Sequence, residues 1–123
     1  MAEIKRDSRY GSTEYFFEGS EIKEKSRYGK VLYYLDQNEI REKSRYGKTK
    51  FYIDGNEIKA DSRYGQTKYY YDRGEVKEKS RYGSVKWIVK NGEVRASSAY
   101  GKTAFYIDGN LSEQQIKALV AIL

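Results

Sequence analysis

The sequence predicts an all-β fold of six 18-residue β-hairpin repeats followed by one short helix. The motif SRYG recurs with a spacing of eighteen residues, at 8–11, 26–29, 44–47, 62–65 and 80–83, and as SAYG at 98–101. Each copy precedes a run rich in Thr, Tyr, Phe, Ile and Val, residue types that favour strands. A fixed period of this length is typical of repeat architectures.

Two kinds of turn alternate along the repeats. Two-residue turns such as Gly55-Asn56 favour positive φ and indicate tight hairpins. In SRYG we expect Ser to begin a turn and Gly to take the left-handed conformation. The first turn pairs Ile53 with Ile58, and a four-residue turn at the next SRYG pairs Ile58 with Tyr69. A continuous antiparallel meander of twelve short strands is therefore self-consistent.

This register assigns side chains to two faces of the predicted sheet. The first face carries Thr49, Phe51, Ile53, Ile58, Tyr69 and Tyr71. The opposite face carries Lys50, Tyr52, Lys59, Lys68, Tyr70 and Lys77. The apolar face needs to be buried by coiling of the sheet, by dimerisation or by its own large tyrosines.

A parallel β-solenoid with one repeat per coil is the alternative fold. Its coils would stack identical repeat positions about 4.8 Å apart. One such ladder would contain Glu21, Glu39, Glu57, Glu75 and Glu93. Like charges at that spacing repel, whereas a meander interleaves different positions. An elongated, twisted antiparallel meander over residues 1–110 is therefore the preferred prediction.

The periodicity ends at Asn110, and residues 111–123 predict a helix in the same domain. Ser112 and Gln115 have the spacing of a capping box. One helical face would carry Ile116, Leu119, Val120 and Leu123. Ten helical residues extend about 15 Å and span only about three strands. We expect this helix to cap the C-terminal end of the array, because a twelve-strand barrel would be too wide for side chains to fill.

Composition narrows the possible functions. The 123 residues carry a net charge of +6 and include neither Cys nor His. Disulfides and thiolate metal sites are therefore excluded, and the commonest acid, base and metal ligand near neutral pH is missing. We expect no enzyme, no cofactor and no metal site. The first residues lack the apolar stretch of a signal peptide, and no window resembles a membrane span, which predicts a cytoplasmic protein without membrane insertion.

The SRYG turns supply the candidate binding residues. In a meander all SRYG turns emerge at one edge of the sheet, with neighbours about 9.6 Å apart. The predicted site comprises Arg9, Arg27, Arg45, Arg63 and Arg81 with Tyr10, Tyr28, Tyr46, Tyr64 and Tyr82. The opposite edge carries Asp36, Asp54, Asp72 and Asp108 with Glu39, Glu57 and Glu75. Alternatively, each arginine pairs with a nearby Glu or stacks on the Tyr of a neighbouring turn.

Two resemblances follow from these motifs. SRYG together with YIDGN, at residues 52–56 and 106–110, resembles bacterial tandem-repeat proteins without an assigned function. The aromatic hairpin at residues 69–74 is similar to choline-binding and related cell-wall-binding repeats, which hold a cation between paired Trp and Tyr rings. Only Trp87 is available here for such a cage.

The sequence thus predicts a non-enzymatic binding or scaffold protein. Extended surfaces made of repeated units are typical of such proteins. We expect a protein partner or self-association first. The second hypothesis is an anionic polymer, either single-stranded nucleic acid or an acidic polysaccharide, bound through the Arg and Tyr side chains of the SRYG edge.

Overall fold

Twelve antiparallel strands and one helix are formed by the residues that the computed structural model describes, which are 1–98 and 100–123. The strands are β1 (Ala2–Arg6), β2 (Thr13–Glu18), β3 (Glu21–Glu24), β4 (Val31–Asp36), β5 (Glu39–Glu42), β6 (Thr49–Asp54), β7 (Glu57–Ala60), β8 (Thr67–Asp72), β9 (Glu75–Glu78), β10 (Val85–Lys90), β11 (Glu93–Ala96) and β12 (Thr103–Gly109). The helix is α1 (Glu113–Ile122). The all-β prediction with a C-terminal helix is confirmed.

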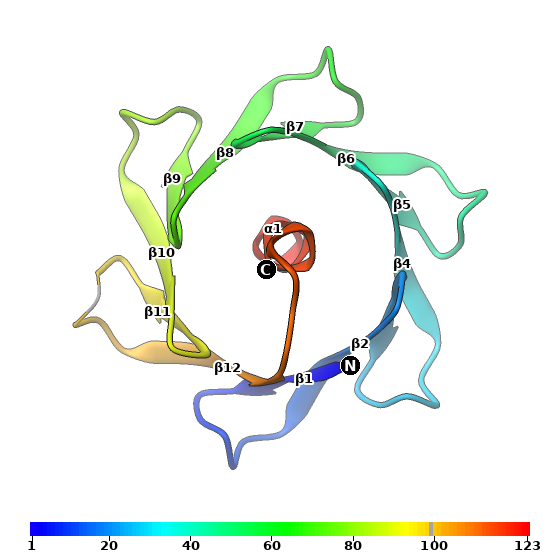
Figure 1. Cartoon of the computed structure of the whole chain (residues 1–123), viewed down its shortest axis with the longest axis vertical. Helices are drawn as coiled ribbons and strands as arrows, with labels where there is room; N and C mark the ends of the chain where they lie inside the picture. The colour runs from blue at the N-terminus through cyan, green and yellow to red at the C-terminus, as the bar shows by residue number, and fades with distance from the viewer. Residues whose placement is uncertain (99) are drawn as a thin grey trace.

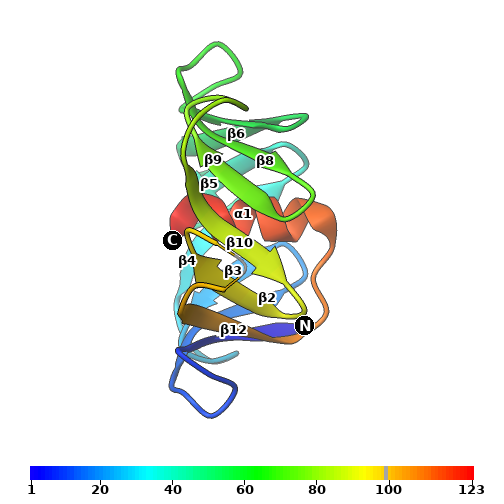
Figure 2. The same cartoon turned by 90° about the vertical axis from the view of Figure 1, so that its left-hand side faces the viewer.

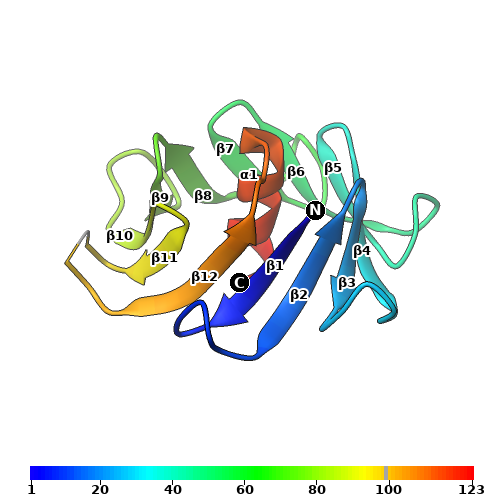
Figure 3. The same ribbon diagram turned by 60° about the horizontal axis from the view of Figure 1, so that its bottom comes forward.

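The sheet closes into a barrel, because β1 pairs with β12 as well as with β2 (Figures 1 and 3). The predictions of an open meander and of a solenoid are therefore wrong. Strand β12 has no return strand after it, and β1 takes that place. Glu3, Ile4 and Lys5 occupy the same repeat positions as Glu57, Ile58 and Lys59 in a later return strand. The two ends of the array are thus halves of one hairpin.

Helix α1 lies inside the barrel and not across its end (Figures 1 and 2). Its residues Ala118, Leu119 and Val120 are completely buried, and Ala121 is nearly so. Four successive buried residues cover every side of the helix, as expected for a helix surrounded by protein. The predicted end cap is therefore wrong in its position, and the helix fills the interior that was expected to be too wide.

The dimensions of the helix and the barrel match. Twelve strands about 4.8 Å apart and tilted by about 40° enclose a ring roughly 24 Å across between backbones. A helix with its side chains is about 10–12 Å across, which leaves room for one layer of side chains from the wall. Six-residue strands tilted by about 40° rise about 15 Å along the barrel axis, which is also the length of a ten-residue helix.

Each repeat contributes three side chains from the wall to this core. The aromatic layer contains Tyr15, Tyr33, Phe51, Tyr69, Trp87 and Phe105; the middle layer contains Phe17, Leu35, Ile53, Tyr71, Val89 and Ile107; and the return strands add Ile4, Ile22, Ile40, Ile58, Val76 and Val94. The middle layer and return strands supply the most deeply buried side chains, whereas the aromatic layer is half-buried. Burial against the helix therefore selects apolar residues at these three repeat positions.

The capping box predicted at the start of α1 is confirmed. The backbone N–H of Gln115 donates to Ser112 Oγ at 3.1 Å, and the backbone N–H of Ser112 donates to Gln115 Oε1 at 2.9 Å. The helix start is also tied to the hairpin turns of the wall. Lys117 Nζ donates to the carbonyl of Gly55 at 2.8 Å, and Gln115 Nε2 donates to the carbonyl of Gly19 at 3.1 Å.

The predicted strand pairing is confirmed in the third and fourth repeats, since Ile53 lies opposite Ile58 and Ile58 lies opposite Tyr69. The predicted face of Thr49 is wrong. The register shifts between Ile40 and Arg41, so a β-bulge turns the first residues of β6. Thr49 therefore donates to the outward-facing carboxylate of Glu39. Lys50, which was predicted to lie outside, has its Nζ 5.6 Å from the ring centre of the core residue Tyr33.

Glycine is required in the SRYG turn because of space, and the predicted left-handed conformation is wrong. The left-handed residue is the one before Ser, for example Asp61 with φ 68°. A Cβ on Gly65 would lie 1.7 Å from the carbonyl oxygen of Ala60. The same close approach to a backbone carbonyl recurs at Gly11, Gly29, Gly47, Gly83 and Gly101. Any side chain at this position would push apart the two strands that the turn joins.

Candidate functional site

The SRYG turns are short loops, held by backbone and Ser hydrogen bonds, that carry an Arg and a Tyr at their tips. In the fourth copy the backbone N–H of Tyr64 donates to Ser62 Oγ at 3.2 Å, and the backbone N–H of Gly65 donates to the Ser62 carbonyl at 2.9 Å. The bond from Tyr N–H to Ser Oγ recurs in all six copies. The Ser and Gly of the motif therefore fix the turn, and its Arg and Tyr remain available to solvent.

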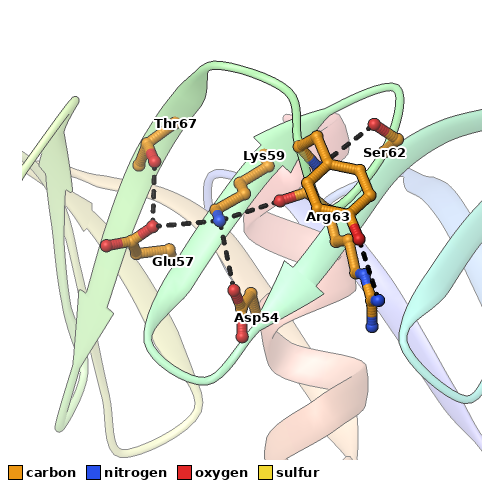
Figure 4. A network of polar contacts seen from close by, with 7 residues as sticks. Asp54, Glu57, Lys59, Ser62, Arg63 and Thr67 are labelled. Atoms are coloured by element: carbon orange, nitrogen blue, oxygen red, sulfur yellow. Dashed lines mark hydrogen bonds and ion pairs between the residues drawn. The ribbon is translucent and has the colours of Figure 1, made fainter.

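A cation of the outer wall, which we call the buttress cation, supports each of the first five turns, as Figure 4 shows for the fourth copy. Lys59 Nζ donates to the carbonyl of Arg63 at 2.9 Å and lies 3.1 Å from Asp54 Oδ2 and 3.7 Å from Glu57 Oε1. The hydrogen bond to Asp54 and the neighbouring charges raise the pKa of Lys59. Glu57 also accepts a hydrogen bond from Thr67 Oγ1 at 3.0 Å.

Other repeats use the same buttress. The cations at this repeat position donate to the carbonyl of the turn arginine, and the pairs are Lys5 with Arg9, Lys23 with Arg27, Arg41 with Arg45, and Lys77 with Arg81. The turn arginine is thus fixed by its backbone while its guanidinium takes no part in the buttress.

The predicted site residues form a ring around one end of the barrel, which we call the Arg–Tyr crown: Arg9, Arg27, Arg45, Arg63 and Arg81 with Tyr10, Tyr28, Tyr46, Tyr64 and Tyr82. Because the sheet is closed, the predicted straight row with a 9.6 Å spacing becomes a ring, and its turns extend outward from the wall (Figure 1). The sixth copy is SAYG, so Tyr100 stands in a ring position that has no arginine.

Each crown arginine lies over the tyrosine of its own turn and not over that of a neighbouring turn. The distances from Cζ to the ring centre are 5.1 Å for Arg9, 5.7 Å for Arg27, 5.1 Å for Arg45, 5.1 Å for Arg63 and 4.9 Å for Arg81. The crown tyrosines are between 81% and 88% exposed. Stacking of this kind is worth about 0.5–1 kcal/mol at an exposed site and orients the guanidinium.

The crown guanidiniums form no ion pair with any carboxylate among residues 1–98 and 100–123. The predicted alternative, in which each arginine pairs with a nearby Glu, is therefore wrong. Arg63 donates to the hydroxyl of Tyr64 at 2.9 Å. Hydrogen bonds to the hydroxyls of Tyr64 and Tyr52 raise the pKa of Arg63.

Charge is divided unequally between the two ends of the barrel. The segments at the crown end are 6–14, 24–32, 42–50, 60–68, 78–86 and 96–104. They contain 15 of the 24 Lys and Arg residues but only six of the 18 Asp and Glu residues, a net charge of +9 against −3 for the rest of the chain. Carboxylates at the opposite end are largely matched by the buttress cations. Asp36 and Glu39, for example, lie 3.6 and 3.0 Å from Arg41 Nη2.

Hollows lie between the crown and the outer wall at equivalent positions. One of about 320 Å³ is lined by Arg63 and Tyr64 of the turn and by Glu39, Thr49 and Tyr52 of the wall. Another, of about 460 Å³, lies across the closure of the barrel. It is lined by the equivalent residues Arg9, Tyr10, Glu93, Thr103 and Tyr106.

The wall tyrosine in these hollows was not predicted to belong to the site. Tyr52 and Tyr106 share one repeat position, the residue after the inward-facing aromatic of the strand. The signal in the sequence that could have identified this tyrosine is the recurrence of Tyr at an outward-facing repeat position. The predicted opposite face already contained Tyr52 and Tyr70, but the outward course of the turns, which brings Tyr64 beside Tyr52, follows only from the three-dimensional structure.

Residues 1–98 and 100–123 contain no group of three Asp or Glu side chains placed to hold a metal ion. Over the same ranges, no helix has both the length and the apolar character needed to span a membrane. Comparisons with family models, with curated proteins and with solved structures found no match to this chain. The resemblance to cell-wall-binding repeats therefore stays a prediction.

Proposed function

We propose that this chain is a non-enzymatic binding protein for anionic polymers and that the Arg–Tyr crown is its binding surface. The observation that carries the proposal is the set of five guanidiniums without a carboxylate partner in the described ranges, each resting on an exposed tyrosine. The buttress cations of this barrel, by contrast, lie among carboxylates.

Single-stranded nucleic acid is the ligand that uses both members of each pair. A guanidinium offers a planar fork of donors to a phosphate. An exposed tyrosine offers a face on which an unpaired base can stack, an interaction worth about 1–3 kcal/mol per base. The net charge of +9 at the crown end favours approach of a polyanion.

The ring arrangement gives this proposal a specific geometry. Because the turns radiate from one end of the barrel, a strand that visits successive turns follows the rim. Each hollow between a turn and the wall, such as the one between Tyr64 and Tyr52, takes one unit of the polymer. The sixth turn has Ala99 in place of arginine and so offers no guanidinium to a phosphate. The path of the bound nucleic acid begins and ends at this turn.

The test replaces Arg27, Arg45 and Arg63 together by Gln. Single-stranded oligonucleotide and an acidic polysaccharide are titrated separately at two salt concentrations. For nucleic acid we expect weaker binding and a shallower dependence of log K on log salt, by about 0.7 for each phosphate that the variant no longer neutralises. A double variant, Arg73→Gln with Lys90→Gln, removes two cations from the opposite end and is compared with Arg45→Gln/Arg63→Gln, which has the same net charge. The control pair should bind like the parent protein.

The outcome separates the polymer hypothesis from its competitor. If the parent protein binds neither polymer at low salt, or if crown and control variants lose affinity equally, the polymer proposal is wrong. The six exposed tyrosines, including Tyr100 at 96%, would then favour a scaffold with a protein partner. Such a partner would be retained in a pull-down that is insensitive to salt.

A further inference from the structure

A further hollow lies away from the crown hollows, over strands β2, β4, β5 and β6 at the crown end of the barrel. Its volume is about 530 Å³, which is within the usual range of small-molecule sites. Two aliphatic residues of β4 and the rings of Tyr15 and Tyr33 form its apolar wall. Its polar lining consists of Lys30, Lys43, Lys50 and Glu42. The hollow thus combines an apolar surface with a net positive charge.

The three lysines are not neutralised by the protein. None of them forms an ion pair with a carboxylate in the described ranges, and Glu42 likewise has no cationic partner there. The ammonium group of Lys50 lies 5.6 Å from the ring centre of Tyr33, which places it over the apolar wall of the hollow. Three ammonium groups around one hollow repel one another, and a bound anion with more than one negative charge would relieve that repulsion.

This concentration of charge breaks the symmetry of the repeats. The positions of Lys30, Lys43 and Lys50 recur six times around the barrel. The five other sets are Ser12, Lys25 and Leu32; Lys48, Asp61 and Lys68; Gln66, Lys79 and Lys86; Ser84, Ser97 and Ala104; and Lys102, Asp7 and Glu14. Among the six sets, only Lys30, Lys43 and Lys50 are all cations. The barrel scaffold therefore does not require lysine at these positions, and their coincidence in one hollow calls for a separate explanation.

Neutral donors and one acceptor complete the lining. The hydroxyls of Tyr15 and Tyr33 have no hydrogen-bond partner among residues 1–98 and 100–123. Burial raises the pKa of Tyr15, so its phenol stays protonated and able to donate at neutral pH. The Glu42 carboxylate, which is also without a partner in the described ranges, can accept from a hydroxyl or amino group of a ligand.

We propose that this hollow binds a small, hydroxyl-bearing phosphate monoester such as a mononucleotide. The lysines hold the phosphate, which carries up to two negative charges. The tyrosine hydroxyls add neutral donors, and Glu42 accepts from a hydroxyl of the ligand body. The flat rings and aliphatic residues of the wall cover the apolar part of the ligand. This site is distinct from the Arg–Tyr crown and does not depend on the function proposed for it.

The experiment measures binding to the full chain by calorimetry, with AMP, ribose 5-phosphate and inorganic phosphate as separate probes. We expect AMP or ribose 5-phosphate to bind at least about tenfold more tightly than inorganic phosphate. Lys30→Gln, Lys43→Gln and Lys50→Gln should each weaken binding about tenfold, the size expected from one charge-assisted hydrogen bond. Lys68→Gln changes the position equivalent to Lys50 in the next repeat, where Asp61 is present, and should leave binding unchanged.

The controls separate this site from general attraction of anions. Tyr33→Phe removes only a hydroxyl and tests the site without changing its charge; it should weaken binding by a smaller factor. The triple crown variant, with Arg27, Arg45 and Arg63 replaced by Gln, should bind AMP like the parent even if it no longer binds polymers. The proposal is overturned if none of the probes binds at low salt, if inorganic phosphate binds as tightly as AMP and ribose 5-phosphate, or if Lys68→Gln weakens binding as much as Lys50→Gln.

Discussion

Ile4 of β1 lies directly opposite Ile107 of β12, and this pair joins the two ends of the repeat array. Both side chains are buried in the core, with Ile4 completely inaccessible. Removal of residues 1–6 should open the barrel and expose the free edges of β2 and β12. Exposed edges pair with other chains, so we expect the truncated protein to associate, as seen by its mass in size-exclusion chromatography with light scattering.

Single substitutions at the same place provide a milder test. Ile4→Ala should lower the free energy of unfolding by about 2–5 kcal/mol, because it leaves a cavity at the closure. Ser12→Ala, at an exposed position, should have no measurable effect. A monomeric protein with an unchanged melting temperature after removal of residues 1–6 would show that closure through β1 does not stabilise the barrel.

Helix α1 should be as important for stability as the wall that surrounds it. Leu119 is completely buried, and Leu119→Ala should cost about 2–5 kcal/mol in urea denaturation. Deletion of Ser112 to Leu123 empties the interior of the barrel and should abolish cooperative unfolding or cause association. Glu113→Gln, at the exposed start of the helix, is the control and should change stability little. A deletion variant that kept its melting temperature and its monomeric mass would contradict the central position of the helix.

Substitution of two glycines distinguishes a position that lacks space for a side chain from a position that needs a positive φ. Gly65→Ala should cost about 2 kcal/mol or more, because its new Cβ meets the carbonyl oxygen of Ala60 and the two strands have to shift. Gly55→Ala should cost only about 1 kcal/mol, because its φ of +61° is left-handed but the space around it is open. Urea denaturation of both variants measures the difference. Equal costs would mean that the turn relaxes around a side chain at Gly65.

The outer wall should make the protein sensitive to acid. A hydrogen bond from Thr49, followed by one from Arg41, lowers the pKa of Glu39 below its usual 4.5. A lowered pKa means that the folded state favours the charged carboxylate. This contribution to stability is therefore present above pH 4.5 and is lost as the pH falls through the folded-state pKa. Glu93 behaves in the same way through Thr103 and then Arg95.

Removal of the hydroxyl tests this origin of the acid sensitivity. Thr49→Val should reduce stability near neutral pH and should flatten the loss of stability between about pH 5 and pH 3, because the pKa of Glu39 then lies closer to its unfolded value. Thr49→Ser keeps the hydroxyl and should behave like the parent. Thermal unfolding at several pH values measures both variants. Identical pH profiles for the parent and Thr49→Val would rule out this hydrogen bond as the cause.

The local structure of the repeats could be predicted from the sequence, because turn length alone determines which residues face each other. The pairing of Ile58 with Ile53 and with Tyr69 followed from the lengths of two turns and from the condition that these side chains share one face. The face of Thr49 could not be predicted, since a β-bulge changes the alternation without leaving a glycine or proline in that strand. The conformation of Gly65 was misjudged because glycine serves equally well for a left-handed φ and for a close approach of backbone.

To predict the closure of the barrel, one would need two signals in the sequence that do not fit the 18-residue repeat. Residues 1–7 look like an incomplete first repeat, although Ile4 occupies the position of Ile58. The helix looks amphipathic when only Ile116, Leu119, Val120 and Leu123 are considered. Ala118 and Ala121 make the other sides apolar as well, and their small size suits a confined space. At the candidate site, the sequence placed the arginines and tyrosines at one end, but stacking within each turn depends on side-chain geometry that no spacing reveals.

The helix inside the barrel also limits how many repeats a chain of this kind can carry. An open array tolerates the gain or loss of a unit, because each repeat contacts only its neighbours. Here one additional hairpin would widen the ring by a sixth and loosen its packing against α1, while one fewer would leave too little space for the helix. A chain with five or seven repeats would therefore need a helix of a different width to fill its barrel.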